Sequence, residues 1–114
     1  MNEMFQLEGT TLRIILPQEL DHPQSDRIRK ETDRIMSRAY IKKIIFDFEN
    51  TDFMDSSGIG LIMGRYRALG MGQKCIAAVN VDRYMDKLLH LSGVHRYMEI
   101  QKKIEEGGHY GKDE

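Results

Sequence analysis

The sequence has little of what several classes of protein depend on. It contains one cysteine, Cys75, so no disulfide can form within the chain, and a disulfide-stabilised secreted fold is excluded. No apolar run approaches the ~20 residues that a membrane-spanning helix needs. A net charge of −1 provides none of the basic excess on which non-specific nucleic-acid binding depends. We therefore expect a cytoplasmic protein that binds neither membrane nor nucleic acid directly.

The composition that is present is typical of one globular domain. Hydrophobic residues make up 40% and charged residues 31% of the 114 residues, a balance seen in folded rather than disordered chains. A chain of this length supports a single core, and it contains no internal repeat or linker. We predict one domain over residues 1–100, followed by a short helical turn and a flexible tail over residues 101–114.

Hydrophobic periodicity predicts an alternation of strands and helices. The predicted strands cover residues 5–8, 12–16, 44–48, 75–79 and 97–100. Helices are expected over residues 24–39 and 57–69, with a third whose apolar stripe runs from Val81 to Leu89 and which stops at Gly93. A last helical turn is expected over residues 101–106. This order predicts an α/β layer with parallel strands and an antiparallel first pair.

The segment from Thr51 to Gly60 carries the most specific chemistry of the chain. It follows the apolar strand at 44–48 and opens an amphipathic helix, so Ser56 and Ser57 fall at a helix N-terminus. The unpaired N–H groups and partial positive charge of such a terminus favour an anion. Two hydroxyls at this place predict a site that carries or meets a phosphate.

A simpler interpretation is that these residues only cap the helix. Ser and Asp are common N-caps, and Asp55, Ser56 or Ser57 can each accept a hydrogen bond from the backbone N–H two or three residues on. One cap needs one side chain, so a second serine is either exposed to solvent or has a functional role. Both interpretations stay open on helix-start chemistry alone.

The glycines of this region match the known nucleotide-binding patterns only in part. In a dinucleotide fingerprint starting at Gly58 and Gly60, the third glycine, Gly64, comes one residue late, and Asn80 replaces the ribose-binding carboxylate. Arg65 follows Gly64 where a phosphate loop has lysine. Neither serine lies in a Gly-x-Ser-x-Gly elbow, and no histidine pairs with other ligands at metal-site spacing. We expect no catalytic or metal-binding residues; a small nucleotide-binding protein using Gly58 and Gly60 is the alternative from another class.

Four motifs occur in one order along the chain. They are Glu19-Leu20-Asp21-His22, Phe53-Met54-Asp55-Ser56-Ser57-Gly58-Ile59-Gly60, Gly64-Arg65-Tyr66 and Leu91-Ser92-Gly93. Together they resemble the STAS-domain anti-sigma factor antagonists, most closely the sporulation type that acts on sigma factor F. The resemblance spans residues 5–100, and its second motif is the most specific. It implies a STAS-like single α/β domain, with a mixed sheet of about five strands, an antiparallel N-terminal pair, and about four helices packed against the sheet.

The resemblance also implies a regulator that switches partners and is not an enzyme. The unphosphorylated form would bind an anti-sigma serine kinase and release the sigma factor, and phosphorylation of Ser56 would switch it off. ATP and Mg²⁺ would belong to the kinase, so the chain itself needs no cofactor, and a PP2C-type phosphatase would reset it. The expected partner-binding residues are Asp21, His22, Met54, Asp55, Ser56, Ser57, Gly58, Ile59 and Gly60. The alternative within the family is a STAS module of another partner-switching pathway, such as one controlling a stress-response sigma factor.

Overall fold

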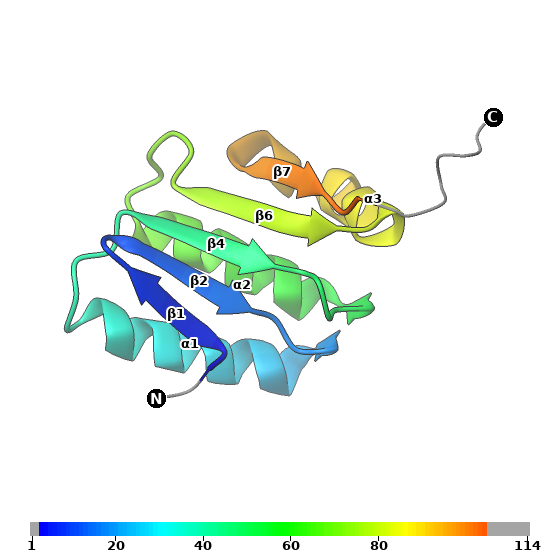
Figure 1. Ribbon diagram of the computed structural model, residues 1–114. Coiled ribbons are helices and arrows are strands. Elements are labelled where there is room, and N and C mark those ends of the chain that lie inside the picture. Colours follow the sequence, from blue (N-terminus) through cyan, green and yellow to red (C-terminus); the bar gives the residue numbers. More distant parts are fainter. Residues whose placement is uncertain (1–2, 105–114) are drawn as a thin grey trace.

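Five strands form the main sheet in the computed structural model, which describes residues 3–104 (Figure 1). In chain order they are β1 (Phe5–Glu8), β2 (Thr11–Ile15), β4 (Lys43–Asp47), β6 (Ile76–Val81) and β7 (Glu99–Lys102), and they lie in the sheet in the same order. The β1 and β2 strands are antiparallel, and every other neighbouring pair is parallel. The predicted mixed sheet with an antiparallel first pair is confirmed.

Residues 3–104 contain three α-helices rather than the expected four or so. They are α1 (His22–Met36), α2 (Ser56–Ala68) and α3 (Arg83–Ser92), and a short 3-10 helix covers Val94–Tyr97. The predicted helical turn at 101–106 is wrong at its start, because Gln101 and Lys102 belong to β7. This backbone pairs with β6, where Lys102 lies opposite Val81. The pairing supplies inter-strand hydrogen bonds, whereas one isolated helical turn would be only marginally stable. Residues 105–114 lie outside the described part of the chain.

The core lies between the sheet and the helices, with α1 and α2 beneath the sheet in the view of Figure 1. Alternation along β4 sends Ile44 and Phe46 to this side, where both are fully buried. The helices meet them with fully buried apolar side chains, namely Ile28 of α1, Ile62 of α2, and Met85 and Leu89 of α3. In the described residues, no helix is both long and apolar enough to cross a membrane.

Helix boundaries follow the capping residues more closely than the apolar stripes. The first helix begins at His22, two residues before the predicted start, because Asp21 caps it and Pro23 is tolerated in a first turn. Val81 closes β6 and is not helical, since α3 begins only after its cap, Asp82. The predicted stop at Gly93 is confirmed: its φ of 84° is a left-handed conformation that favours glycine.

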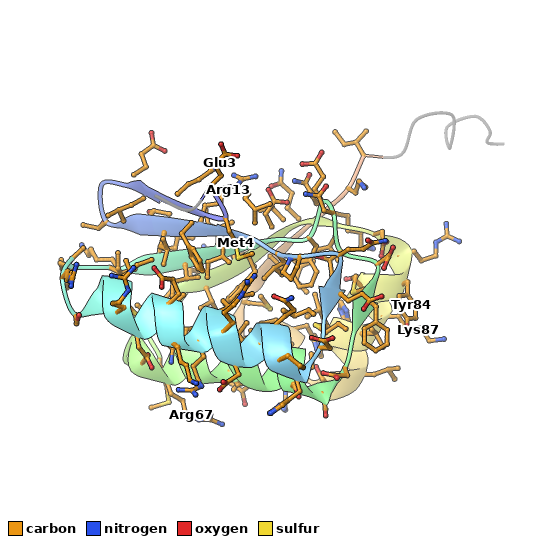
Figure 2. The ribbon with its side chains drawn as sticks, turned by 90° about the horizontal axis from the view of Figure 1, so that it is seen from below. Glu3, Met4, Arg13, Arg67, Tyr84 and Lys87 are labelled. Carbon is orange, nitrogen blue, oxygen red and sulfur yellow. The ribbon has the colours of Figure 1, made fainter. Side chains whose placement is uncertain are left out.

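The sheet face away from the helices carries a buried carboxylate. Asp47 of β4 accepts hydrogen bonds from Arg13 (2.6 Å), Asn80 (2.9 Å) and the backbone N–H of Glu49 (2.9 Å). Figure 2 shows Arg13 on this face and Arg67 on the far side of the helices. Burial disfavours the charged form of the Asp47 carboxyl, but its hydrogen bonds outweigh that cost and hold its pKa below the usual range.

Candidate functional site

A second sheet of two short parallel strands brings the starts of α1 and α2 together. These strands are β3 (Glu19–Leu20) and β5 (Phe53–Met54), with Leu20 opposite Met54. Sequence analysis predicted no strand at either segment, because two residues are too few to show a period. Each strand leads directly into a helix, so their pairing sets the two helix N-termini beside each other.

An aspartate caps each of these helices. The Asp21 carboxylate accepts a hydrogen bond from the N–H of Gln24 at 3.1 Å, and the Asp55 carboxylate accepts one from the N–H of Ser57 at 2.8 Å. Asp55 is therefore the side chain that caps α2. Neither serine hydroxyl is therefore used as the cap.

The two serines of the first turn of α2 have different surroundings. The Ser57 side chain is half-buried, and its Oγ lies 3.3 Å from Nδ1 of His22, the first residue of α1. Ser56 is exposed, and within residues 3–104 its hydroxyl makes no hydrogen bond. The structure thus presents one free hydroxyl and one that is engaged across the helix pair.

The serines also open onto different hollows. Ser57 lines one of about 280 Å³ between α1 and α2, together with His22, Ser25, Asp26, Arg29, Gly60 and Leu61. Ser56 lines another of about 300 Å³ between α2 and α3, together with Met54, Asp55, Ile59, Leu88, Leu91 and Ser92. A partner that reaches Ser56 therefore meets residues of α3 as well.

Sequence analysis did not assign the α3 residues of this hollow, Leu88, Leu91 and Ser92, to the site. Leu91 is 73% exposed and lies in the same hollow as Ser56. The sequence does indicate that Leu91 is exposed, because it falls outside the apolar stripe of α3 that buries Met85 and Leu89.

Gly58 and Met54 form the floor of the site rather than its surface. A Cβ on Gly58 would lie 2.5 Å from Cγ of Met54 and 2.9 Å from Cδ2 of Leu20, so any larger residue here would force the Met54 side chain to shift. Met54 is buried, at 6% exposure. A Cβ on Gly60 would meet nothing within 4 Å, so that glycine is not required by close contact. Together, these residues let β3, β5 and α2 approach closely.

The first turn of α2 has the chemistry to carry a negative charge. A helix N-terminus leaves backbone N–H groups unpaired and bears a partial positive charge, so added phosphate is tolerated electrostatically. The Asp55 cap already uses one of these N–H groups. An anion on Ser56 would consequently lie next to a carboxylate as well as the helix terminus.

The fold and the site define a small α/β domain that exposes the hydroxyl of Ser56 at a helix start. The chain belongs to the STAS domain family, which matches residues 5–107. A relative from Paenibacillus polymyxa, named as an anti-sigma F factor antagonist, is 36% identical over 89 residues, which cover 78% of this chain and 76% of the relative.

Two solved structures are similar over most of the chain. The anti-sigma factor antagonist SpoIIAA in its unphosphorylated form matches with a TM-score of 0.73 and 33% identity, covering 87% of this chain and 89% of SpoIIAA. The Bacillus cell fate determinant SpoIIAA in its phosphorylated form matches with a TM-score of 0.64 and 35% identity, covering 87% of this chain and 92% of that structure's chain.

Proposed function

We propose that this protein is an anti-sigma factor antagonist of the sigma F type, switched off by phosphorylation of Ser56. The observation that carries the proposal is the exposed Ser56 hydroxyl, which makes no hydrogen bond within residues 3–104 and stands at the start of α2. The name of the Paenibacillus relative supports the sigma F pathway. In this proposal the chain is a substrate and binding partner, not an enzyme.

Ser56 is the better acceptor of the two serines for a geometric reason. A kinase must bring the acceptor oxygen in line with the transferred phosphoryl group, which requires an accessible hydroxyl. Ser57 is half-buried and its Oγ is engaged by His22. Phosphorylating Ser57 would require that contact to break first.

The unphosphorylated protein binds an anti-sigma serine kinase through the surface around Ser56. That surface comprises Asp21 and His22 at the start of α1, Asp55, Ser56, Ser57, Ile59 and Gly60 at the start of α2, and Leu91 of α3, with the buried Met54 and Gly58 supporting it from below. Binding releases the sigma factor that the kinase holds. ATP and Mg²⁺ belong to the kinase, a PP2C-type phosphatase removes the phosphate, and the sigma-factor partner places the complex in the cytoplasm.

Phosphorylation changes the surface rather than the fold. The phosphate adds about two negative charges at Ser56. The helix N-terminus offsets part of this charge, so α2 remains folded. At the interface, however, the phosphate fills the hollow beside Leu91 and faces Asp55 across a surface fitted to a neutral hydroxyl. A loss of ~3 kcal/mol would weaken binding more than a hundredfold.

The acceptor assignment is tested with matched serine variants. The wild type, Ser56→Ala and Ser57→Ala proteins are incubated with ATP, Mg²⁺ and the anti-sigma serine kinase of the same organism. Intact mass and peptide mapping should show one phosphate on the wild type and on Ser57→Ala, and none on Ser56→Ala. Phosphate found on Ser57 or Thr51 of the Ser56→Ala protein would show that the assignment is wrong.

A further inference from the structure

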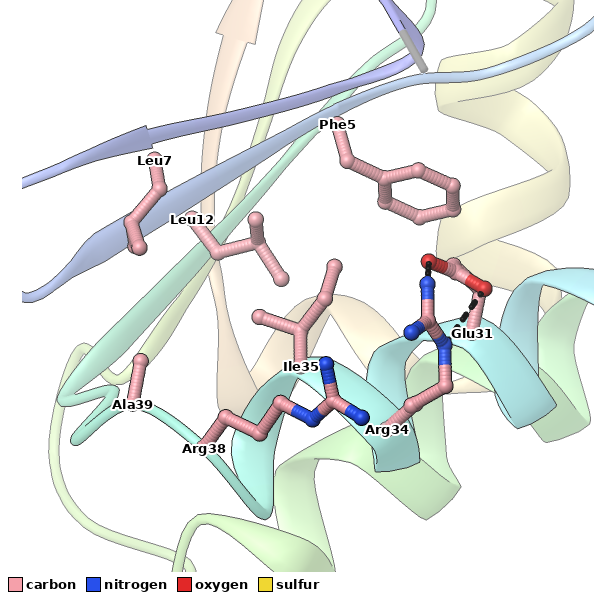
Figure 3. Close-up of a pocket in the computed structure, with 8 residues that line it drawn as sticks. All are labelled: Phe5, Leu7, Leu12, Glu31, Arg34, Ile35, Arg38 and Ala39. Atoms are coloured by element: carbon pink, nitrogen blue, oxygen red, sulfur yellow. Dashed lines mark hydrogen bonds and ion pairs between the residues drawn. The ribbon is translucent and has the colours of Figure 1, made fainter. Parts of the chain in front are cut away.

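A hollow of about 260 Å³ lies at the other end of α1 from the serines (Figure 3). It is lined by Phe5, Leu7, Leu12, Glu31, Arg34, Ile35, Arg38 and Ala39. Glu31 is the lining residue of α1 nearest to the helix start at His22, and it lies about 13 Å along the helix from it, at 1.5 Å per residue. None of the residues proposed for partner binding lines it, so an inference about this hollow does not rest on the proposed function.

The walls of the hollow are apolar on both sides. Figure 3 shows Phe5, Leu7 and Leu12 on the strand side, and Ile35 and Ala39 on the helix side. Leu12 is fully buried and forms the floor, whereas Leu7 is 43% exposed at the edge strand β1. Because α1 ends at Met36, no further helical turn covers Leu7. An apolar chain placed here would bury surface that the protein itself leaves open.

The rim of the hollow carries an unmatched positive charge. Arg34 is paired with Glu31 through two contacts, at 2.6 Å and 3.3 Å, and this pairing lowers the pKa of Glu31. Arg38, one turn further along, has no hydrogen bond or ion pair from its guanidinium to any residue of 3–104. The charge of Arg38 also contributes to the lowered pKa of Glu31, but two guanidinium groups and one carboxylate leave a net positive charge at the rim that can attract an anion.

We propose that this hollow binds a small amphipathic carboxylate, such as a medium-chain fatty acid. The alkyl chain lies against Leu7, Leu12 and Ile35, and the carboxylate pairs with Arg38. An apolar pocket with one convergent charged group is the usual form of a small-molecule site. The hollow holds the volume of about nine water molecules, at about 30 Å³ each. A single short alkyl chain fits this volume.

The test is a titration of the isotope-labelled full chain with octanoate, kept below its micellar concentration and followed by amide chemical shifts. We expect saturable shifts at Leu7, Leu12 and Ala39, and none at Ser56. The Arg38→Gln variant should bind octanoate about fivefold more weakly, which is the effect of losing one partly exposed ion pair. Arg67→Gln is the matched control, since Arg67 is exposed on α2 and lines none of this hollow, and it should bind as the wild type does.

Octanol tests the charge requirement separately, because it carries the same chain without a carboxylate. Octanol should bind the wild type more weakly than octanoate does. The affinity for octanol should be the same in the wild type and in Arg38→Gln. Shifts that do not saturate, shifts that map elsewhere, or the same loss in Arg38→Gln and Arg67→Gln would each overturn the proposal. Equal affinity of the wild type for octanol and octanoate would overturn it as well.

Discussion

At the scale of single residues, one contact distinguishes the two serines. They are adjacent in the chain, and a helix-start pattern alone does not separate them. The His22 ring at 3.3 Å engages Ser57, while the hydroxyl of Ser56 has no protein partner within residues 3–104. A residue that comes from a different helix therefore decides which hydroxyl is available.

Removing His22 should release Ser57 as an acceptor. In a Ser56→Ala background, we expect the additional His22→Ala change to make Ser57 phosphorylation detectable by peptide mapping. A hydrogen bond of this kind contributes about 1 kcal/mol, so the rate of phosphate incorporation at Ser57 should rise about fivefold.

Two comparisons control this experiment. His22→Gln keeps a side chain able to hydrogen-bond Ser57 and should restore part of the protection. His90→Ala removes an exposed histidine of α3 that lies outside the α1–α2 contact and should leave Ser57 unmodified. If Ser57 carries no phosphate in the Ser56→Ala, His22→Ala protein, then the kinase, and not the contact with His22, prevents phosphorylation of Ser57.

At the scale of secondary-structure elements, strand pairing positions the site. The β3–β5 pair sets the N-termini of α1 and α2 side by side, and Gly58 allows α2 to approach Met54 and Leu20. On the opposite face of the main sheet, Asp47 links β4 to Arg13 of β2 and Asn80 of β6.

The Asp47 cluster should make stability depend on pH. Because the folded pKa of this carboxyl lies below its ordinary value of 3.8, its contribution is complete above that value and is lost as the pH falls through the folded pKa. We expect Asp47→Asn to cost about 1–2 kcal/mol of unfolding free energy at neutral pH, where hydrogen bonds to the charged group are lost.

Urea unfolding at neutral pH and at about pH 3 measures this difference, since an ordinary carboxyl is largely protonated at the lower value. The cost of Asp47→Asn should be smaller in acid, because the wild-type carboxyl begins to lose its charge there. The matched control is Asp52→Asn, an exposed aspartate whose carboxylate accepts, among residues 3–104, only from Gln18, and its effect should be small at both pH values. A cost for Asp47→Asn that does not change with pH would contradict the linkage.

Elements with a clear hydrophobic period could be predicted from the sequence, and short ones could not. The continuous apolar run over residues 44–48 predicted β4, in which Ile44 and Phe46 are fully buried. The β3 and β5 strands contain two residues each, and only pairing between distant segments makes them strands. Similarly, Gln101 lies in β7 because β6 is beside it. Tertiary context decided these cases over local preference.

At the scale of the whole molecule, the candidate site combines parts that the sequence shows and parts that only the fold brings together. The Asp55-Ser56-Ser57-Gly58 motif was visible in the chain, as was its place at a helix start. The contact with His22 and the exposed Leu91 depend on how α1 and α3 lie against α2. Side chains that approach through tertiary packing leave no fixed spacing in a single sequence.

The whole molecule is also a layered scaffold that a surface phosphate does not need to disturb. Ser56 lies outside the core, which consists of apolar side chains between the sheet and the helices. A partner-binding switch built on this surface can therefore operate through charge and shape at the interface, with the sheet and helices unchanged.

The most direct test of the central claim is the affinity of the anti-sigma serine kinase for the two forms of this protein. Isothermal titration should compare unphosphorylated protein with protein carrying phosphate on Ser56, both shown to be folded by circular dichroism. The account predicts tight binding of the unphosphorylated form and an affinity more than about a hundredfold weaker for the phosphorylated form. Equal affinities for two equally folded forms would contradict it.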